Sequence, residues 1–196
     1  MNILVACEFS GRVRDALIAV GVNAISADIL PSEQPGPHIQ GDVRPILRER
    51  WDLVIAHPPC QYLALSGVSW RIKRQEWKEV SDAADFFMDC LNANAPQVAV
   101  ENPVMHGYAG IRKPNFTVQP WQFGDNFTKR TCFWTRGLPP LVANSRLDGT
   151  SAVAECHLAS KGRDRWKRRS RTYPGIAMAI ADQWYVHRQM TLLGIL

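Results

Sequence analysis

The chain has 196 residues, of which 46% are hydrophobic and 21% are charged, and its formal net charge at pH 7 is +5. This composition is typical of a folded domain that buries a sizeable core. Its apolar runs all fall short of the roughly 20 residues that cross a bilayer, which argues against a membrane protein. The first residues lack the basic leader of a signal peptide, so we expect a cytoplasmic protein.

The five cysteines are widely spaced and form no CxxC pair. An odd number without such a pair favours reduced thiols and argues against both a disulfide framework and a zinc cage. Cys156 and His157 are adjacent, but a metal site needs more ligands than this pair supplies. We therefore predict no metal site.

Short apolar runs alternate along the chain with segments of helical spacing. Strands are predicted over residues 3–6, 23–27, 53–56 and 97–100, with a strand edge at 41–43 and further strands over 117–123 and 131–135. Helices are predicted from Val13 to Val20, over 45–50 and 71–92, and in a C-terminal segment where Ile176, Ile180 and Trp184 share one face. This alternation predicts an α/β fold with a mostly parallel, twisted sheet and helices on both faces.

The stretch from residue 139 to 171 lacks periodicity and ends in a basic run. Residues 161–171 hold seven basic side chains and one acidic side chain, with Trp166 among them. Such a run suits a nucleic-acid backbone with one stacking aromatic side chain, and a solvated surface loop is the other interpretation. The candidate nucleic-acid-binding residues are Arg163, Arg165, Lys167, Arg168, Arg169 and Arg171.

Polar residues stand at the ends of the predicted strands. In chain order they are Glu8, Asp28, Asp42, Cys60, Glu101 and Asn102. Because the carboxyl ends of parallel strands meet at one edge, where α/β proteins bind ligands, we expect these side chains to gather there. Each has a structural alternative, since Asp28 and Asp42 suit turns and Cys60 suits a core position. Their coincidence favours a functional site in which the Cys60 thiol is a nucleophile.

The turn after the first strand carries one glycine, Gly11, and the chain has no GxGxxG or Walker motif there. A dinucleotide pyrophosphate needs closer backbone approach than this turn allows. A cofactor without phosphate, such as S-adenosylmethionine, suits it better, and Asp28 is placed to accept hydrogen bonds from ribose hydroxyls.

Together these motifs resemble the cytosine-C5 DNA methyltransferase family, in the same order and over most of the chain. Residues 7–11 resemble the family's first motif, 41–43 its Gly-Asp-Ile motif, 58–61 its Pro-Cys-Gln motif and 101–103 its Glu-Asn-Val motif. Residues 129–131 resemble a reduced Gln-x-Arg-x-Arg motif, and 172–181 the final motif. Amino-methyltransferases of the same fold carry a tyrosine where Cys60 stands, so the resemblance selects methylation at carbon.

The resemblance implies a Rossmann-like methyltransferase fold with S-adenosylmethionine as cofactor. The cofactor-binding residues it implies are Phe9, Ser10, Gly11, Asp28, Asp42 and Pro58. It assigns the nucleophile to Cys60, the acid partner to Glu101, and the orienting of Glu101 and the base to Asn102 and Arg130. It divides the chain into a catalytic core over 1–138, a reduced target-recognition segment over 139–171, and a C-terminal helix over 172–196 that returns to the core.

The chain also departs from the family. The first motif lacks an acidic start and a second glycine, and His57 precedes the two prolines where a small residue is usual. The interval for target recognition, about 137–171, is small for major-groove readout. We expect DNA, double- or single-stranded, as the partner, with low specificity or with help from a homo-oligomer or a specificity partner. Compact chains of this type resemble phage and prophage proteins of bacterial hosts, for which a role in modifying phage DNA against restriction is natural.

Two other functions stay open. A related pyrimidine-C5 enzyme would keep Cys60 and Glu101 but transfer a hydroxymethyl group, or act on a nucleotide or a single strand. A nucleic-acid-binding homologue without catalysis would keep only the fold and the basic run. The presence of both Cys60 and Glu101 favours an enzyme.

Overall fold

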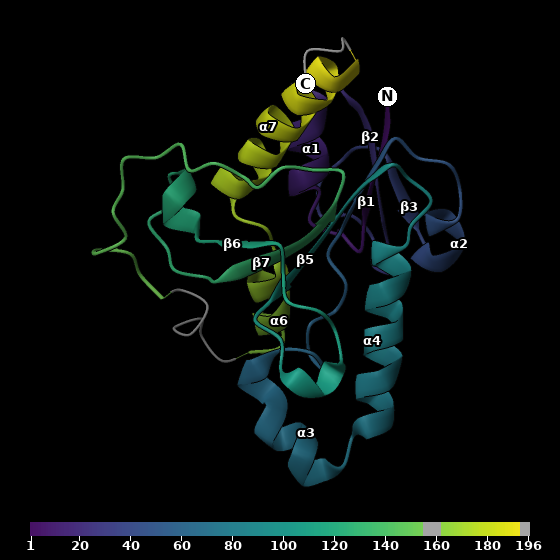
Figure 1. Cartoon of the computed structure of the whole chain (residues 1–196), viewed down its shortest axis with the longest axis vertical. Coiled ribbons are helices and arrows are strands. Elements are labelled where there is room, and N and C mark those ends of the chain that lie inside the picture. Colours follow the sequence, from purple (N-terminus) through teal and green to yellow (C-terminus); the bar gives the residue numbers. More distant parts are fainter. Residues whose placement is uncertain (155–161, 193–196) are drawn as a thin grey trace.

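A seven-stranded sheet in the order β3-β2-β1-β4-β5-β7-β6 forms the centre of the molecule (Figure 1). The structure is a computed structural model that describes residues 1–154 and 162–192, with side chains as far as Tyr185. Cys156 and His157, weighed above as metal ligands, lie outside the described residues.

The central strands are parallel and buried. β1 (Asn2–Ala6) pairs with β2 (Asn23–Asp28) and β4 (Leu53–Ala56), and β4 pairs with β5 (Gln97–Pro103). Short continuous apolar runs suit strands that are covered on both faces. β7 (Thr131–Arg136) is antiparallel to β5 and to β6 (Phe116–Val118). The prediction of a mostly parallel sheet is confirmed.

Helices cover both faces of this sheet (Figure 1). α1 (Arg12–Ala19) and α7 (Pro174–Leu192) lie side by side on one face, where Trp184 joins the core formed with β1 and β4. α2 (Val43–Leu47) and α4 (Trp77–Leu91) cover the other face, where Phe87 lies in the second core. Successive strand residues face opposite sides, so the strands β1, β2, β4, β5 and β7 contribute to both cores.

The third strand ends before the position predicted for it. β3 spans His38–Gln40 and pairs with β2, whereas the sequence predicted a strand edge at 41–43. Asp42 instead caps α2, because its carboxylate accepts a 3.0 Å hydrogen bond from the backbone N–H of Arg44. Aspartate is a preferred N-cap residue, and this bond starts the helix earlier than the predicted residue 45.

The helix predicted over 71–92 is two helices. α3 spans Val68–Arg74 and α4 begins at Trp77, and Gln75 between them has a left-handed φ of 54°. α3 buries none of its residues. The prediction was wrong here because the polar residues before Trp77 have good helix propensity but no apolar face that would continue the direction of α4.

Shorter elements fill the connections. The strand predicted over 117–123 ends at Val118, because Pro120 has no N–H to donate to a ladder and starts the 3₁₀ turn η3 (Pro120–Phe123). Two further 3₁₀ turns, η1 and η2, span Leu65–Gly67 and Gly107–Ala109. The segment predicted as loop-rich contains helix α6 (Arg165–Ser170).

Trp184→Ala is expected to lower the free energy of unfolding by about 3–5 kcal/mol, because truncation of a fully buried aromatic side chain leaves a cavity. Trp184 is 0% exposed, contacts the Phe133 ring at 5.8 Å between centroids, and donates its indole N–H to the Pro139 carbonyl. Urea denaturation followed by circular dichroism measures the change.

Met178→Ala on the exposed side of the same helix is the matched control, since Met178 is 60% exposed. It should change stability by less than about 0.5 kcal/mol. Equal losses from the two substitutions would contradict the packing of α7 described above.

Candidate active site

The register of the parallel strands places polar residues at one edge of the sheet. Ala56 of β4 pairs with Ala6 of β1 on one side and with Val100 of β5 on the other. His57 and Glu101, the next residues along β4 and β5, are consequently neighbours. This is the carboxyl edge, where open α/β sheets bind ligands.

A rigid turn presents Cys60 at this edge. The two prolines before it have no N–H groups, so they end the pairing of β4. The carbonyl of Pro58 accepts a 2.9 Å hydrogen bond from the side-chain amide of Asn102, which is buried at the end of β5. The carbonyl of Cys60 accepts bonds of 3.1 and 2.9 Å from two N–H groups of the following turn. Cys60 is the exposed cysteine among those that the structure describes.

Glu101 is buried, and its carboxylate contacts the ring of His57. The distance from His57 Nδ1 to Glu101 Oε2 is 3.2 Å. Burial alone would raise the pKa of Glu101, but the hydrogen bond from His57 and the positive charge of Lys129 hold that pKa below its ordinary value. Glu101 is therefore ionised at neutral pH, and His57 donates the bond.

The pKa of the Cys60 thiol is shifted in the opposite direction, upward. Desolvation by surrounding groups, followed by the charge of Glu101, raises the pKa of Cys60, whereas Lys129 and Arg169 oppose this rise. The residue as a whole is exposed, although neighbouring groups desolvate its thiol. The free protein accordingly carries a neutral thiol at neutral pH.

Lys129 acts at this site, next to the predicted Arg130. Its charge lowers the pKa values of both Cys60 and Glu101, and its ammonium group donates to two backbone carbonyls at the end of α6 and just beyond. Arg130 is exposed. The cation that acts on Cys60 and Glu101 is therefore Lys129, one residue before the predicted Arg130.

The turn after β1 is organised by Glu8. Its Oε1 accepts hydrogen bonds from the Ser10 hydroxyl at 2.7 Å and the Val13 N–H at 3.3 Å, while Oε2 is buried without a partner. Burial raises the pKa of Glu8 despite the bond from Ser10. Gly11, with φ of 74°, turns the chain into α1, and a Cβ there would lie 2.5 Å from the Arg14 guanidinium.

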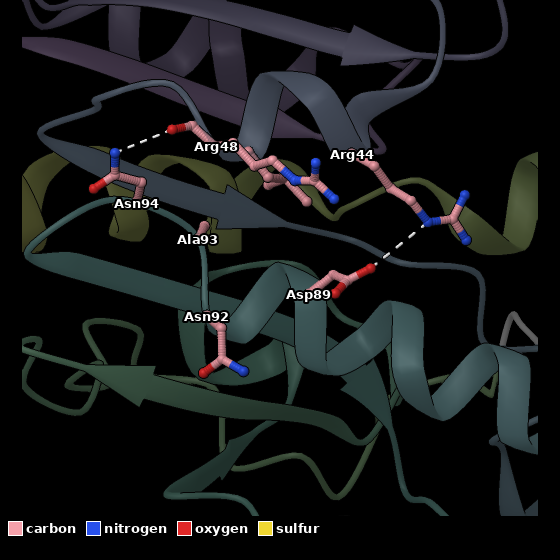
Figure 2. Close-up of a pocket in the computed structure, with 7 residues that line it drawn as sticks. Arg44, Arg48, Asp89, Asn92, Ala93 and Asn94 are labelled. Carbon is pink, nitrogen blue, oxygen red and sulfur yellow. Dashed lines mark hydrogen bonds and ion pairs between the residues drawn. The ribbon is translucent and has the colours of Figure 1, made fainter.

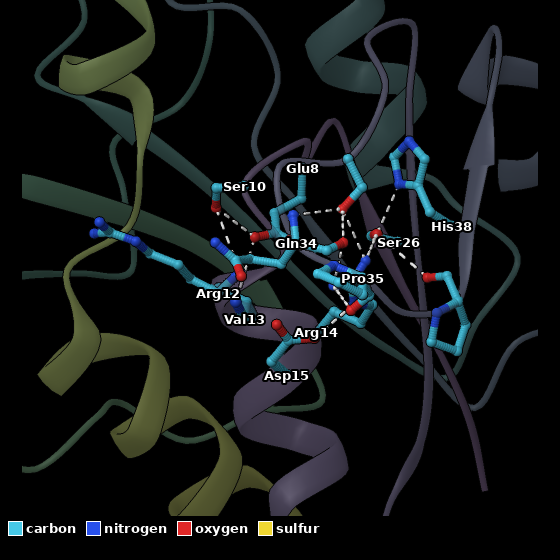
Figure 3. A network of polar contacts seen from close by, with 12 residues as sticks. Glu8, Ser10, Arg12, Val13, Arg14, Asp15, Ser26, Gln34, Pro35 and His38 are labelled. Carbon is cyan, nitrogen blue, oxygen red and sulfur yellow. Dashed lines mark hydrogen bonds and ion pairs between the residues drawn. The ribbon is translucent and has the colours of Figure 1, made fainter.

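Arg14 ties this turn to the loop between β2 and β3 (Figure 3). The residue is fully buried, and a buried cation needs several acceptors. Its guanidinium donates to the hydroxyls of Ser26 and Ser32 and to the carbonyls of Gln34 and Pro35. The same loop donates the N–H of Glu33 to the carbonyl of Phe9 at 2.8 Å, so it covers the β1 turn.

The two acidic residues predicted to hold a cofactor differ in placement. Asp28 is buried at the end of β2, where one oxygen accepts a 2.9 Å bond from the Leu30 N–H and burial raises the pKa. Asp42 is exposed and occupied with capping α2 and with an ion pair to Arg44 at 3.6 Å. Asp28 alone of the two lies buried at the sheet edge.

A small cavity lies between the β1 turn, His57 and the segment that leads into α7. Its lining residues are Cys7, Glu8, Phe9, Ser10, His57, Ser170 and Thr172. It has about 30 Å³ of space, room for one or two water molecules. Oε2 of Glu8 and Nε2 of His57, both buried without a partner, belong to residues of this lining.

α6 lies against the β1 turn. The ring of Trp166 contacts that of Phe9 at 6.0 Å between centroids. Just beyond α6, Arg171 pairs with Glu33 through two bonds of 2.8 and 2.7 Å. Arg171, predicted to bind nucleic acid, therefore fastens α6 to the loop between β2 and β3.

The other predicted nucleic-acid-binding residues lie on α6 or beside it. Arg163 and Arg168 are exposed, and the Lys167 ammonium lies 5.8 Å from the centroid of the Trp166 ring. Arg165, like Lys167, is half-buried. Arg169 differs, because its Nε is buried without a partner among the described residues and its charge reaches Cys60.

Helix α3, which follows the Cys60 turn, carries candidates that the sequence prediction missed. Trp70 is 57% exposed, and Lys73 and Arg74 place cations 5.7 and 5.6 Å from its ring centroid. Arg71 lies over the ring of Tyr62 at 4.6 Å. The signal was present in the sequence as a basic run around a tryptophan, the pattern also found in α6.

A larger hollow lies elsewhere, between α2 and α4 (Figure 2). Its lining includes Arg44, Arg48, Asp89 and Asn94, and Arg44 pairs with Asp89 at 3.6 Å. The lining has no nucleophile, and none of its atoms is among the described buried groups that lack a partner. We assign it no role.

Within residues 1–154 and 162–192, no three His, Cys, Asp or Glu side chains are grouped to hold a metal ion. No helix in that part of the chain has the length and apolar character to span a membrane.

Glu101→Gln is expected to speed alkylation of Cys60 by iodoacetamide at pH 7.5 by about three- to tenfold, because removal of a charge that raises the thiol pKa increases the thiolate fraction. Peptide mass spectrometry, which reads each cysteine separately, measures the rate. Glu79→Gln on the surface of α4 is the control and should leave the rate unchanged. A Glu101→Gln rate at or below wild type would contradict the electrostatic coupling of Glu101 to Cys60.

No protein-family model and no curated protein matches the chain. Among solved structures, it matches a candidate DNA modification methyltransferase encoded within a prophage (E. coli), with 15% identity over 69% of this chain and 46% of that one and a TM-score of 0.46. It also matches the Entamoeba histolytica methyltransferase EhMeth, with 14% identity over 83% of this chain and 61% of that one and a TM-score of 0.44. The chain spans less than two thirds of the length of either. The sheet order 3-2-1-4-5-7-6 with an antiparallel β7 is consistent with the methyltransferase Rossmann-like fold, and the predicted fold class is confirmed.

Proposed function

We propose that the protein is a DNA cytosine-C5 methyltransferase that uses S-adenosylmethionine. The observation that carries this proposal is the placement of an exposed thiol, Cys60, and a buried carboxylate, Glu101, at the ends of adjacent strands. The two groups are close enough for the charge of Glu101 to raise the pKa of the Cys60 thiol. A nucleophile beside a group that can exchange a proton suits addition to a pyrimidine ring.

Cytosine C5 is too weak a nucleophile to accept a methyl group unaided. In the proposed reaction the Cys60 thiol gives its proton to solvent, the sulfur bonds to C6, the ring electrons shift toward N3, and N3 takes up a proton through Glu101. C5, now enamine-like, takes the methyl group, which S-adenosylmethionine supplies from its sulfonium when bound. Loss of the C5 proton to a base expels Cys60 and restores the ring, and the N3 proton returns to Glu101.

The side chains around the small cavity suit this cofactor in their chemistry. Oε2 of Glu8 and Nε2 of His57 lack partners, and polar groups of a bound ligand would satisfy them. The carboxylate of Asp28 accepts a bond from the Leu30 N–H, and its remaining lone pairs would accept hydrogen bonds from ribose hydroxyls. The cavity of about 30 Å³ is smaller than the cofactor, so binding requires α6 and the segment beyond it to move away from the β1 turn.

DNA is the proposed substrate because cations and exposed aromatic side chains flank Cys60. α6 carries Trp166 and its basic run, and α3 carries Trp70 with Lys73 and Arg74. Cations contact phosphates and tryptophans stack on bases, which suits an unpaired strand. A target base in a duplex would have to leave the helix to reach Cys60.

The narrow cavity favours one alternative. A pyrimidine-C5 enzyme with a different one-carbon donor would use Cys60 and Glu101 in the same way and would not need room for S-adenosylmethionine at the β1 turn. Its product would carry a hydroxymethyl group, and its substrate could be a nucleotide.

Methylation is tested by incubating the protein with methyl-labelled S-adenosylmethionine and double-stranded DNA, single-stranded DNA or dCMP in separate reactions. Digestion and mass spectrometry are expected to show labelled 5-methylcytosine from DNA. Cys60→Ala should abolish the product because it removes the sulfur that forms the C6 adduct, whereas Ser66→Ala, at an exposed position of η1, should retain it.

The absence of modified cytosine in all three reactions, with wild type equal to Cys60→Ala, would contradict the proposal. Hydroxymethylcytosine formed only with another one-carbon donor would favour the alternative.

Trp70→Ala is expected to weaken binding of single-stranded DNA about 5- to 150-fold, because stacking of one base on an aromatic ring is worth about 1–3 kcal/mol. Lys73→Glu should weaken binding. It should also reduce the slope of log K against log salt concentration by about one, the value for one lost phosphate contact. Fluorescence anisotropy at several salt concentrations measures both effects.

Lys78→Glu on α4 is the matched charge control, because its side chain is 82% exposed and pairs with Asp82. If Lys73→Glu and Lys78→Glu weaken binding equally, α3 does not contact the single-stranded DNA.

A further inference from the structure

His57 is a buried titratable residue that the proposed reaction does not yet use. It stands between the end of β4 and the two prolines, and its side chain is 7% exposed. Nδ1 lies 3.2 Å from Glu101 Oε2, and Nε2 is buried without a partner. The ring also lines the small cavity beside Glu8. His57 therefore connects the carboxylate at the site of attack with the interior of the cavity.

Charged groups from several elements surround His57. Glu101 faces it from β5, Glu8 from the β1 turn and Asp28 from the end of β2, and the positive form of His57 lowers the pKa of each. Lys129, before β7, acts on Glu101 from the other direction. Three carboxyl groups from three elements thus interact with the ring, and Lys129 acts on Glu101, the carboxyl group that His57 contacts.

The proposed reaction poses a difficulty for Glu101 that His57 resolves. An ionised carboxylate has no proton to give, yet N3 of the base must gain one when the thiolate adds to C6. Among the described residues, His57 is the side chain that donates a hydrogen bond to Glu101. Histidine is also the side chain suited to exchanging a proton near neutral pH.

We propose that His57 is the positioning residue that stores the proton for Glu101, holding it on Nδ1 until the base is attacked. This inference rests on the function proposed above. In the proposed resting pair both ring nitrogens of His57 carry a proton and the Glu101 carboxylate is negative, so the pair is neutral. As sulfur bonds to C6, the N–H bond at Nδ1 breaks, the proton passes to Glu101 and then to N3, and the pair is left with one negative charge. When Cys60 leaves, the proton returns by the same route.

The test is exchange of the cytosine C5 hydrogen with deuterated water in single-stranded DNA, without any methyl donor. Exchange needs the Cys60 adduct, delivery of a deuteron to C5 and loss of the original proton, but no cofactor, so it reads adduct formation independently of methyl transfer. His57→Asn keeps an N–H donor near the position of Nδ1 but cannot hold the extra proton, and His57→Ala removes both. Mass spectrometry of the DNA gives the rate between pH 5 and pH 8.5.

At pH 7.5 His57→Asn should exchange about tenfold or more slowly than wild type, a loss within the range for a missing proton donor. The ratio should rise toward one as the pH falls to 5, because loss of the His57 charge raises the pKa of Glu101 in the variant, whose carboxylate then takes up its own proton from solvent. A ratio that stays constant over the pH range, or a His57→Asn profile equal to wild type, overturns the proposal. If wild type itself exchanges no faster than Cys60→Ala, the proposed function fails, and the failure is seen without any His57 variant.

A second measurement needs no activity. The ¹³C signal of the Glu101 carboxyl group is expected to titrate below its ordinary pKa in wild type and to move upward in His57→Ala, with His57→Asn between them. An unchanged Glu101 titration in His57→Ala would remove the contact on which the proposal stands. Thermal unfolding of each variant establishes that the comparison is between folded proteins.

Discussion

The alignment of β4 and β5 at their carboxyl ends is the constraint on which the rest of the site depends. Because the register pairs Ala56 with Val100, His57 meets Glu101 one residue later. A slip of one residue would turn every side chain to the opposite face and separate them. The following prolines end the strand, and the Asn102 amide holds the carbonyl of Pro58. Cys60 is thereby fixed relative to Glu101 by backbone geometry rather than by direct contact.

In the free protein, the protonation states of Cys60 and Glu101 do not match their roles in the proposed reaction. Cys60 carries its proton and Glu101 lacks one, which is the reverse of what attack on cytosine requires. Lys129 links this balance to α6, because its ammonium group donates to carbonyls at the end of α6 and its charge acts on the thiol. Any displacement of α6 that admits a ligand to the cavity therefore also changes the charge environment of Cys60.

The strand ends could be predicted from the sequence, because apolar runs stopped by prolines or acidic residues mark buried parallel strands. The sequence placed Asp42 at a strand edge, but it caps α2. An aspartate suits both positions, and the helix cap forms here. The division between α3 and α4 was missed because a polar segment carries no apolar periodicity to show its direction. The pairing of Arg171 with Glu33, 138 positions apart in sequence, could not be foreseen, since a tertiary contact between surface charges leaves no local pattern. His57 was noticed only as an unusual residue, and its contact with Glu101 depends on the register.

The most direct test of the central claim is a covalent trap with DNA that contains 5-fluorocytosine, in the presence of S-adenosylmethionine. Fluorine at C5 cannot leave as a proton does, so an enzyme that attacks C6 and transfers a methyl group stays attached to the base. The account predicts an adduct that survives denaturation, maps to the peptide carrying Cys60 and is lost in Cys60→Ala. DNA that binds the protein but forms no adduct, or an adduct on another residue, would contradict it.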